Sequence, residues 1–200
     1  MEYVIFRPYW NPPYGITVKE LVPHQRRDPT YFDREQLEIV ASGDDDAKPL
    51  AVTDENLAAV VAGKLHLRQR PGPENSLGLA KFIFPNSDNV YMHGTPAQAL
   101  FARVRRDFSH GCVRLEDPAR FAEWVLRDNP AWPRQKIDEA MKGERPTRVN
   151  LKQPLTVVLF YDTFHVNSEG VVFFADDIYA HDRALDAALV RGYPYAIKRS

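Results

Sequence analysis

The residues best suited to covalent chemistry are Cys112, the only cysteine, and two histidines near it. His110 shares the stretch "SHGCVRL" with the cysteine, and His93 lies 19 positions upstream of Cys112 in "YMHGT". A thiol is nucleophilic as its thiolate, and a free cysteine, with a pKa of about 8.5, is mostly protonated at pH 7. An adjacent base or imidazolium overcomes this limit. The stretch therefore predicts a cysteine nucleophile with His93 or His110 as its base.

The neighbours of His93 bear on how that base would be oriented. A neutral imidazole needs an acceptor at its second nitrogen to fix the tautomer. No carboxylate adjoins His93, so a backbone carbonyl has to fill this role; Asp107 is a possible carboxylate partner but a weaker candidate.

The residues around Cys112 predict contacts to a substrate. Gly111 lets the backbone turn tightly, so that the amides of Gly111 and Cys112 can stabilise an oxyanion. Arg114 follows two positions after the cysteine, and a guanidinium binds a carboxylate through two parallel hydrogen bonds.

Structural roles are the alternative for each of these residues. A lone cysteine is often a small buried hydrophobic residue, a lone histidine is more often structural than catalytic, and Arg114 could form a surface ion pair. His93, His110 and Cys112 could also supply three metal ligands, but no CxxC or HxxxH pair accompanies them, which disfavours a metal site.

Apolar patterns predict the elements that must position these residues. Strands are expected at 3–10, 79–86 and 89–95, and two more strands around "NSEG" form a hairpin. Helices should start at Thr95–Pro96 and Asp117–Pro118, because threonine or aspartate caps a helix and proline suits its first position. The second helix would bury one stripe of residues, namely Phe121, Trp124, Val125 and Leu126.

The remaining segments complete a mixed α+β fold on a β-sheet core. Residues 17–66 combine helical spacing with proline breaks and resemble a small helical insertion; within it, Thr53 or Asp54 can cap a short helix. A terminal helix should end near Gly192. We expect one domain over residues 1–200, with strands and a helix over 151–200.

Composition excludes several classes of protein. The 200 residues are 44% hydrophobic with a net charge of −1, so the chain is globular and nothing points to nucleic acid. No apolar run approaches the roughly 20 residues of a membrane span. The start "MEYVIFRPYW" lacks the basic region of a signal peptide and suggests a trimmed piece of a longer protein.

The combination "HGT", fifteen residues from 94 to 108, then "SHGCVRL" resembles the L,D-transpeptidase catalytic domain with its YkuD-like fold. "RPYWNPP", "RQRPGPENSLGLAKFIFPN", "VYMHGTP" and the tail "YDTFHVNSEGVVFFADDIYAHD" resemble the larger Gram-negative subgroup. The resemblance implies a β-sheet-rich sandwich whose helical capping insertion is residues 17–66. That subgroup carries a peptidoglycan-binding domain upstream, and "HGT" replaces the "HDT" found in parts of it.

The resemblance also implies a role for each motif residue. Cys112 matches the nucleophile and His93 the general base, with the Gly94 carbonyl orienting His93. His110 and Gly111 match the supporting histidine and the oxyanion-side glycine. The resemblance further implies that Ser109 supports the loop, that Arg114 contacts a substrate carboxylate and that Tyr91 lines the pocket.

The implied activity is peptidoglycan L,D-transpeptidation, an acyl transfer in cell-wall biosynthesis and cell-shape maintenance. Cys112 would attack the bond between diaminopimelate and D-alanine in a tetrapeptide stem, and a second stem's amine would resolve the thioester. Carbapenems would acylate the same sulfur. No metal or organic cofactor is implied, and the location would be the periplasm or cell envelope. Water or a lipoprotein lysine are alternative acceptors, and a non-catalytic peptidoglycan-binding module is the alternative of another class.

Overall fold

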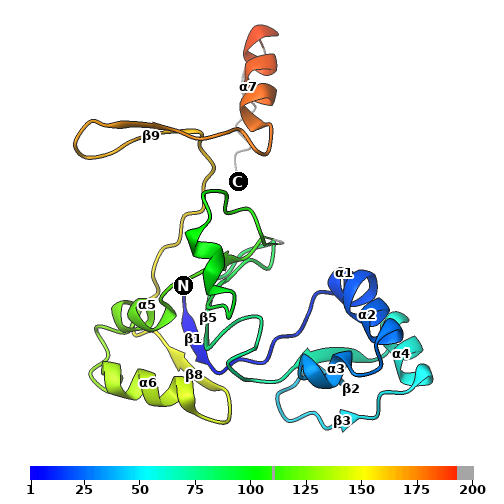
Figure 1. Ribbon diagram of the computed structural model, residues 1–200. Helices are drawn as coiled ribbons and strands as arrows, with labels where there is room; N and C mark the ends of the chain where they lie inside the picture. The colour runs from blue at the N-terminus through cyan, green and yellow to red at the C-terminus, as the bar shows by residue number, and fades with distance from the viewer. Residues whose placement is uncertain (110, 193–200) are drawn as a thin grey trace. The chain divides into compact units, whose positions relative to one another are not determined.

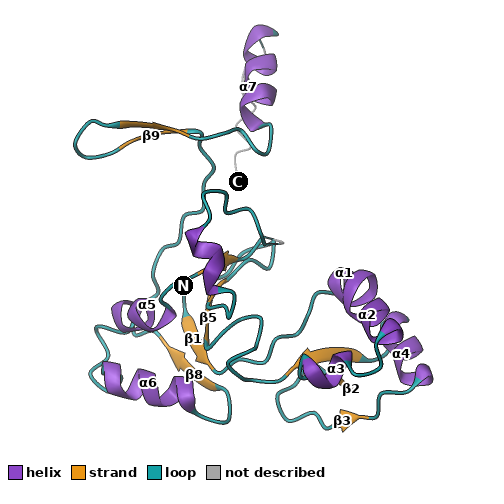
Figure 2. Cartoon of the chain, in the orientation of Figure 1, coloured by secondary structure: helices purple, strands orange, loops and turns teal. Residues whose placement is uncertain are grey.

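A computed structural model of the chain describes residues 1–109 and 111–192. The chain divides between Val157 and Val158 into two compact units. Both units contain helices and strands (Figures 1 and 2), so the predicted α+β class is confirmed.

The main sheet of the first unit contains, among the described residues, five strands in the order β7-β6-β5-β1-β8. Strand β1 pairs antiparallel with β5 and β8, β5 pairs antiparallel with β6, and β6 pairs parallel with β7. The bounds are Tyr3–Phe6 for β1, Ala80–Ile83 for β5, Met92–His93 for β6, Val113–Arg114 for β7 and Thr147–Asn150 for β8. Strand β8 was not predicted from the sequence.

One face of this sheet is the core of the first unit. Val4, Phe6, Phe82 and Val149 project from it and are buried against α5 (Pro118–Val125) and α6 (Arg134–Lys142), which lie beside β1 and β8 in Figure 1. Alternation along a strand makes this possible, since every second residue points to the same face. The residues that alternate with these along each strand project from the opposite face.

Helix α5 starts as predicted, because the Asp117 side chain accepts a hydrogen bond from the amide of Arg120 at 2.9 Å and Pro118 takes the first position. The predicted buried stripe is wrong at Trp124, which is 52% exposed. Its ring is covered by the guanidinium of Arg127, 4.7 Å from the ring centroid. The small side chain of Ala122 takes the fully buried position instead.

The helix predicted to start at Thr95 is replaced by a 3-10 helix, η2, over Gln98–Ala102. The Thr95 hydroxyl does accept a hydrogen bond from the amide of Ala97 at 3.1 Å, but it closes a turn instead of a helix. Val104 is fully exposed. The apolar side chains of this segment thus lack the packing that would stabilise a longer helix.

A second sheet and its helices occupy residues 10–70 of the first unit. Strands β3, β2 and β4 form the sheet in that order, and the helices pack around Phe32, Ile39, Leu57 and Leu67. Thr53 caps α4 by accepting from the amide of Asn56 at 3.1 Å. The bounds are Tyr14–Ile16 for α1, Thr17–Leu21 for the π-helix η1, Val22–Arg27 for α2, Tyr31–Arg34 for α3, Leu37–Val40 for β2, Pro49–Leu50 for β3, Asp54–Val61 for α4 and His66–Gln69 for β4. These strands were missed by the sequence analysis, which found helical spacing alone.

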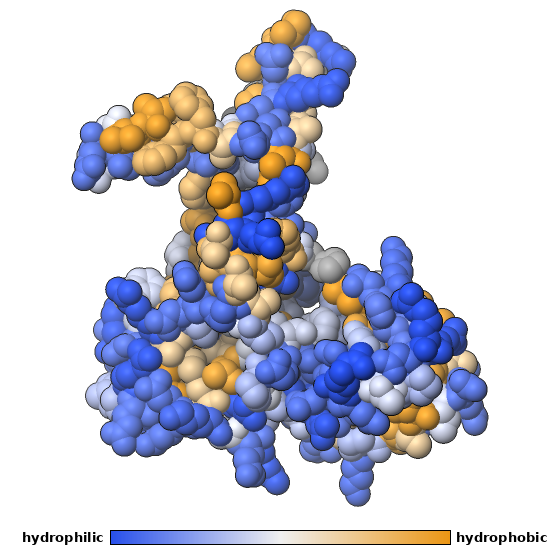
Figure 3. Space-filling model, in the orientation of Figure 1, coloured by the Kyte–Doolittle hydropathy of each residue, from blue (hydrophilic) through white to orange (hydrophobic). Residues whose placement is uncertain are grey.

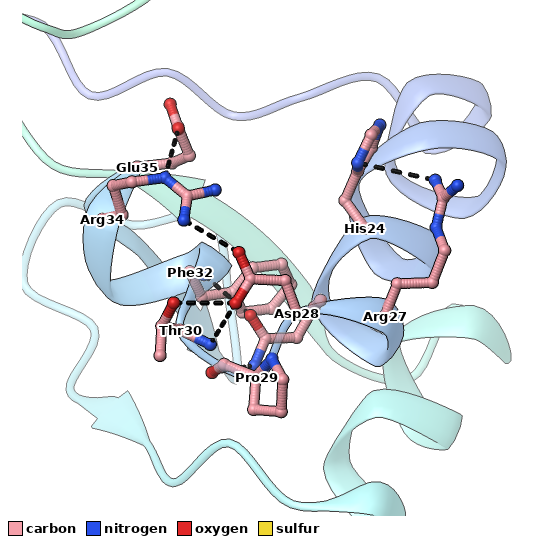
Figure 4. Close-up of polar contacts among 9 residues, drawn as sticks. His24, Arg27, Asp28, Pro29, Thr30, Phe32, Arg34 and Glu35 are labelled. Carbon is pink, nitrogen blue, oxygen red and sulfur yellow. Dashed lines mark hydrogen bonds and ion pairs between the residues drawn. The ribbon is translucent and has the colours of Figure 1, made fainter.

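The turn between α2 and α3 is built around Asp28 (Figure 4). Its carboxylate accepts hydrogen bonds from the amide and hydroxyl of Thr30 at 3.0 and 2.7 Å and from Arg34 at 2.8 Å. These bonds lower the pKa of Asp28 to about 2, and the bond from Arg34 contributes most to this shift. The pair is exposed on the surface.

The second unit contains the predicted hairpin and terminal helix. Strands β9 (Phe164–Val166) and β10 (Val172–Phe174) pair antiparallel, and α7 covers His181–Val190. Gly192 follows the helix with a φ of 69°, a conformation that suits glycine. Apolar side chains lie on the surface of the hairpin (Figure 3), including those of Phe164, Phe173 and Phe174.

Candidate active site

Strand register places the candidate site on the face of the main sheet that points away from α5 and α6. Lys81 pairs with His93 across β5 and β6, and His93 pairs with Arg114 across β6 and β7. Directly paired residues project to the same face, and so do residues two apart on one strand. Five polar side chains therefore share this face: Lys81, Tyr91, His93, Cys112 and Arg114.

The backbone continues the ladder up to the cysteine. The amide of Val113 donates to the carbonyl of Tyr91 at 3.0 Å, and the amide of Leu115 donates to the carbonyl of His93 at 2.8 Å. These bonds hold the segment that follows Cys112 against the strand that contains His93. Phe82 and Met92, on the same strands, point to the core and hold β5 and β6 in this register.

Cys112 is half-buried immediately before β7. Gly111 precedes it with a φ of 130°, a conformation that strains any other residue. The Ser109 hydroxyl accepts a hydrogen bond from the Gly111 amide at 3.2 Å, so Ser109 does contact this loop. His110 lies outside the described residues.

His93 is 6% exposed and its Nδ1–H donates a short hydrogen bond to the carbonyl of Gly94. This is the acceptor expected from the sequence, and it leaves the Nε2 lone pair available. Burial lowers the pKa of His93 to about 4, with smaller contributions from the charges of Arg114 and Lys81, against the opposing effect of the Gly94 bond. The imidazole is consequently neutral at pH 7 and able to accept a proton.

Tyr91 connects the thiol to the rest of the face. Its ring centroid lies 4.2 Å from the Lys81 ammonium and 5.8 Å from the His93 ring. Burial raises the pKa of Tyr91, and the charge of Cys112 and a hydrogen bond with its side chain raise it further. The phenol is therefore protonated at neutral pH and contacts Cys112.

The two remaining polar candidates differ in position. Asp107 pairs with Arg105 through two bonds of 2.6 and 2.7 Å, so its carboxylate is engaged by that guanidinium. Arg114 donates from Nη1 to the carbonyl of Phe108 at 3.1 Å, while its buried Nε finds no acceptor among the described residues. That Nε is the donor on this face that a bound carboxylate could satisfy.

Gly78 is a supporting residue that the sequence analysis missed. It has a φ of 61°, and a Cβ at this position would lie 2.5 Å from the amide nitrogen of Thr95 and 2.7 Å from the carbonyl carbon of Gly94. Asn75 holds this loop: its side chain donates to the carbonyls of Pro8 and Arg70 at 3.2 and 2.9 Å. Only the tertiary structure shows that "NSLG" supports the backbone after His93.

Lys81 was also missed, although a signal was present. A lysine in the middle of the apolar strand "LAKFIFPN" has to project from the face opposite its buried neighbours Ala80 and Phe82. Pairing that face with His93 requires the strand register, which the sequence does not display.

Comparison with known proteins shows which family the chain resembles. Residues 1–158 match the family model of the YkuD L,D-transpeptidase catalytic domain, which ends within one residue of the first compact unit. The chain is also 28% identical over 185 residues to a Haemophilus influenzae protein named "Putative L,D-transpeptidase". The aligned part covers 92% of this chain and 37% of that relative.

Within residues 1–109 and 111–192, no helix has the length and apolar character that crossing a membrane requires. The family match covers more than three quarters of the chain and includes β6, which contains His93, and β7, which follows Cys112 directly. The chain therefore belongs to the YkuD family of L,D-transpeptidase catalytic domains.

Proposed function

We propose that this chain is the catalytic part of a peptidoglycan L,D-transpeptidase with Cys112 as its nucleophile and His93 as its base. The observation that supports this most is a half-buried thiol on the same sheet face as a neutral imidazole whose Nδ1–H is fixed by Gly94. An imidazole held in this way accepts a proton at Nε2 alone, which is the requirement for activating a nearby thiol.

The reaction follows from these roles. Nε2 of His93 takes the thiol proton, and Sγ of Cys112 attacks the carbonyl carbon between diaminopimelate and D-alanine. The oxyanion collapses, the C–N bond breaks, and the imidazolium returns the proton to the departing amine of D-alanine. A second stem's amine then attacks the thioester and loses its proton to His93, which reforms the thiol and leaves a 3-3 cross-link.

The other candidate residues have supporting roles in this proposal. Gly111, with its positive φ, turns the backbone so that amides near the sulfur can meet the oxyanion, and Ser109 supports that turn. The supporting role proposed for His110 rests on the sequence motif alone. The buried Nε of Arg114 would donate to a stem carboxylate, and Tyr91 would line the pocket beside the sulfur.

The wider setting rests on the same proposal. Peptidoglycan stems are the partners, carbapenems acylate Cys112, and the site of action is the cell envelope, in the periplasm. Residues 17–66 form a capping insertion within one catalytic domain over 1–200, and 151–200 supply the terminal hairpin and helix. Water or a lipoprotein lysine would use the same thioester, because acceptor choice depends on the second substrate channel.

Incubation of the protein with purified disaccharide-tetrapeptide, followed by mass spectrometry, tests this function. We expect a dimer that has lost one D-alanine, and no product from Cys112→Ala, whose fold is checked by thermal unfolding. Tripeptide alone would reassign the chain as a carboxypeptidase. Turnover that survives in Cys112→Ala would refute the nucleophile, and a stem that binds without turnover in both proteins would indicate a binding module.

Gly78→Ala is expected to slow D-alanine release by about tenfold or more, since a misplacement of 1 Å near a catalytic group can cost 10²-fold. The new methyl would meet the backbone at Gly94 and Thr95, which must shift and carry the acceptor of the His93 bond with it. Gly63→Ala is the matched control: Gly63 also has a positive φ, of 71°, but its added methyl meets no atom within 4 Å. Equal rates for the two variants would show that the Gly78 contact does not position His93.

A further inference from the structure

Lys81 is a half-buried cation on the candidate site face. Its Cα pairs with that of His93, and its ammonium lies 4.2 Å from the centroid of the Tyr91 ring. Burial lowers the pKa of Lys81, while the charges of Cys112 and Asp45 raise it. The lysine is thus within electrostatic range of the sulfur.

The ionisable groups around the sulfur come from four parts of the first unit. Lys81 on β5 and Arg114 on β7 flank His93 on β6, and both lower the pKa of that imidazole. Tyr91 contributes a neutral phenol. Asp45, in the loop between β2 and β3, is the carboxylate that acts on Lys81.

Burying a lysine costs free energy unless the charge is used or paired. An ammonium over an aromatic face is stabilised by the ring, and it polarises the ring's hydroxyl toward a better hydrogen-bond donor. Here that hydroxyl contacts Cys112. The lysine therefore acts on the sulfur both directly, through its charge, and through Tyr91.

We propose that Lys81 is a positioning residue that stabilises the thiolate of Cys112: its ammonium, held over the Tyr91 ring, supplies positive charge beside the sulfur and keeps the Tyr91 hydroxyl directed to it. This inference deepens the proposed function, on which it rests for the use of Cys112 as a nucleophile. A lysine that only filled space with its aliphatic stem would have no effect on thiolate formation.

The pH dependence of Cys112 alkylation by iodoacetamide tests this, because only the thiolate reacts and no peptide substrate is needed. Lys81→Met keeps the stem and removes the charge. We expect alkylation at pH 7 to slow by about tenfold and the midpoint of the pH–rate profile to move up by about one unit, the lower end for loss of a nearby opposite charge. Lys81→Arg, which keeps a cation that can lie over the ring, should stay within about threefold of the native rate.

Lys136→Met is the matched control, since Lys136 also lies over an aromatic ring, 4.8 Å from the Trp132 centroid, but on α6. Its alkylation profile should not change. A second variant gives the opposite sign and does not depend on the folding of Lys81→Met. Asp45→Asn, in an exposed loop, removes the carboxylate that opposes Lys81 and should speed alkylation at pH 7 by about two- to threefold.

Unchanged profiles in Lys81→Met and Asp45→Asn would overturn the proposal, as would equal slowing in Lys81→Met and Lys81→Arg, which would indicate packing alone. If Lys81→Met does not fold, the rate of Asp45→Asn decides: no rise overturns the proposal. The proposed function fails separately, since it requires D-alanine release from a tetrapeptide. A chain that releases no D-alanine can still show the charge dependence of alkylation. A chain that releases D-alanine can equally show alkylation that does not depend on Lys81.

Discussion

A His93→Gln variant is expected to release D-alanine about 10²- to 10⁴-fold more slowly than the native protein, the usual contribution of a positioned general base. The glutamine amide approximates the size of the imidazole and can still donate to the Gly94 carbonyl, but its nitrogen cannot accept a proton. The measurement is single-turnover acylation of Cys112 by a tetrapeptide. His66→Gln is the control, because His66 lies exposed on β4 in the other sheet. A rate loss below about threefold would show that His93 is not the base.

The pH dependence of the native protein provides an independent test of the same residue. The folded imidazole titrates near pH 4, whereas an unfolded histidine titrates near 6.5. Between these values the unfolded chain binds one more proton, so the free energy of unfolding falls as pH is lowered through this window. The loss is about 3 kcal/mol at most. Urea unfolding at pH 4.5 and 7 measures it, and His93→Gln should lose this part of the slope.

The pH dependence of the acylation rate should reflect the same shifted pKa of His93. Because His93 stays neutral down to about pH 4, acylation should not decline near pH 6.5 from protonation of this group. A decline centred at 6.5 that vanishes in His93→Gln would show that the imidazole is more solvated than its 6% exposure indicates.

Local signals in the sequence predicted elements whose stabilisation is also local. Asp117 caps α5 and Thr53 caps α4 through bonds within three residues, so the sequence contains both partners of each bond. The acceptor of His93 is likewise its neighbour Gly94. The motif spacing further indicated that His93 and Cys112 work together, and the parallel pairing of β6 and β7 brings their strands side by side.

Residues whose role depends on distant partners were not predicted. Lys81 and Gly78 contact segments ten or more positions away, and these contacts appear only once β5 and β6 are in register. The failed helix at Thr95 has the same origin: its cap and proline are adequate, but burial of its apolar side chains was not available. Local propensity was overridden by the absence of a packing partner.

Among the residues that were not predicted, Arg68 is expected to have the largest effect on the free energy of unfolding. In the sequence it is one polar residue in "HLRQ", whereas in the structure its side chain is 2% exposed. Its guanidinium pairs with the carboxylate of Glu38, with Nε at 2.9 Å, and lies 4.1 Å from the centroid of the Tyr9 ring. It also donates to the carbonyls of Asp44 and Ala47 at 2.6 and 2.9 Å. The buried guanidinium is therefore paired with a carboxylate and with backbone carbonyls, and it anchors the loop between β2 and β3.

Arg68→Leu is expected to lower the free energy of unfolding by about 3–5 kcal/mol, since removing one partner of a buried ion pair leaves the other without compensation. Arg34→Leu is the matched control: Arg34 pairs with Asp28 at 2.8 Å on the surface (Figure 4), where solvent screens the charges, so a much smaller loss is expected. Urea unfolding of both variants at pH 7 makes the comparison. Similar losses would show that burial does not set the strength of the Arg68 pair.

The same variant connects this loop to the candidate site. Arg68 holds the carbonyls on either side of Asp45, the carboxylate that acts on Lys81. If Arg68→Leu remains folded at low temperature, the released loop no longer fixes Asp45, and alkylation of Cys112 should rise in the same direction as in Asp45→Asn. Combining Arg68→Leu with Asp45→Asn should then add nothing further to the rate, because both changes remove one interaction. Additive rises would mean that Arg68 acts on the site by a route other than Asp45.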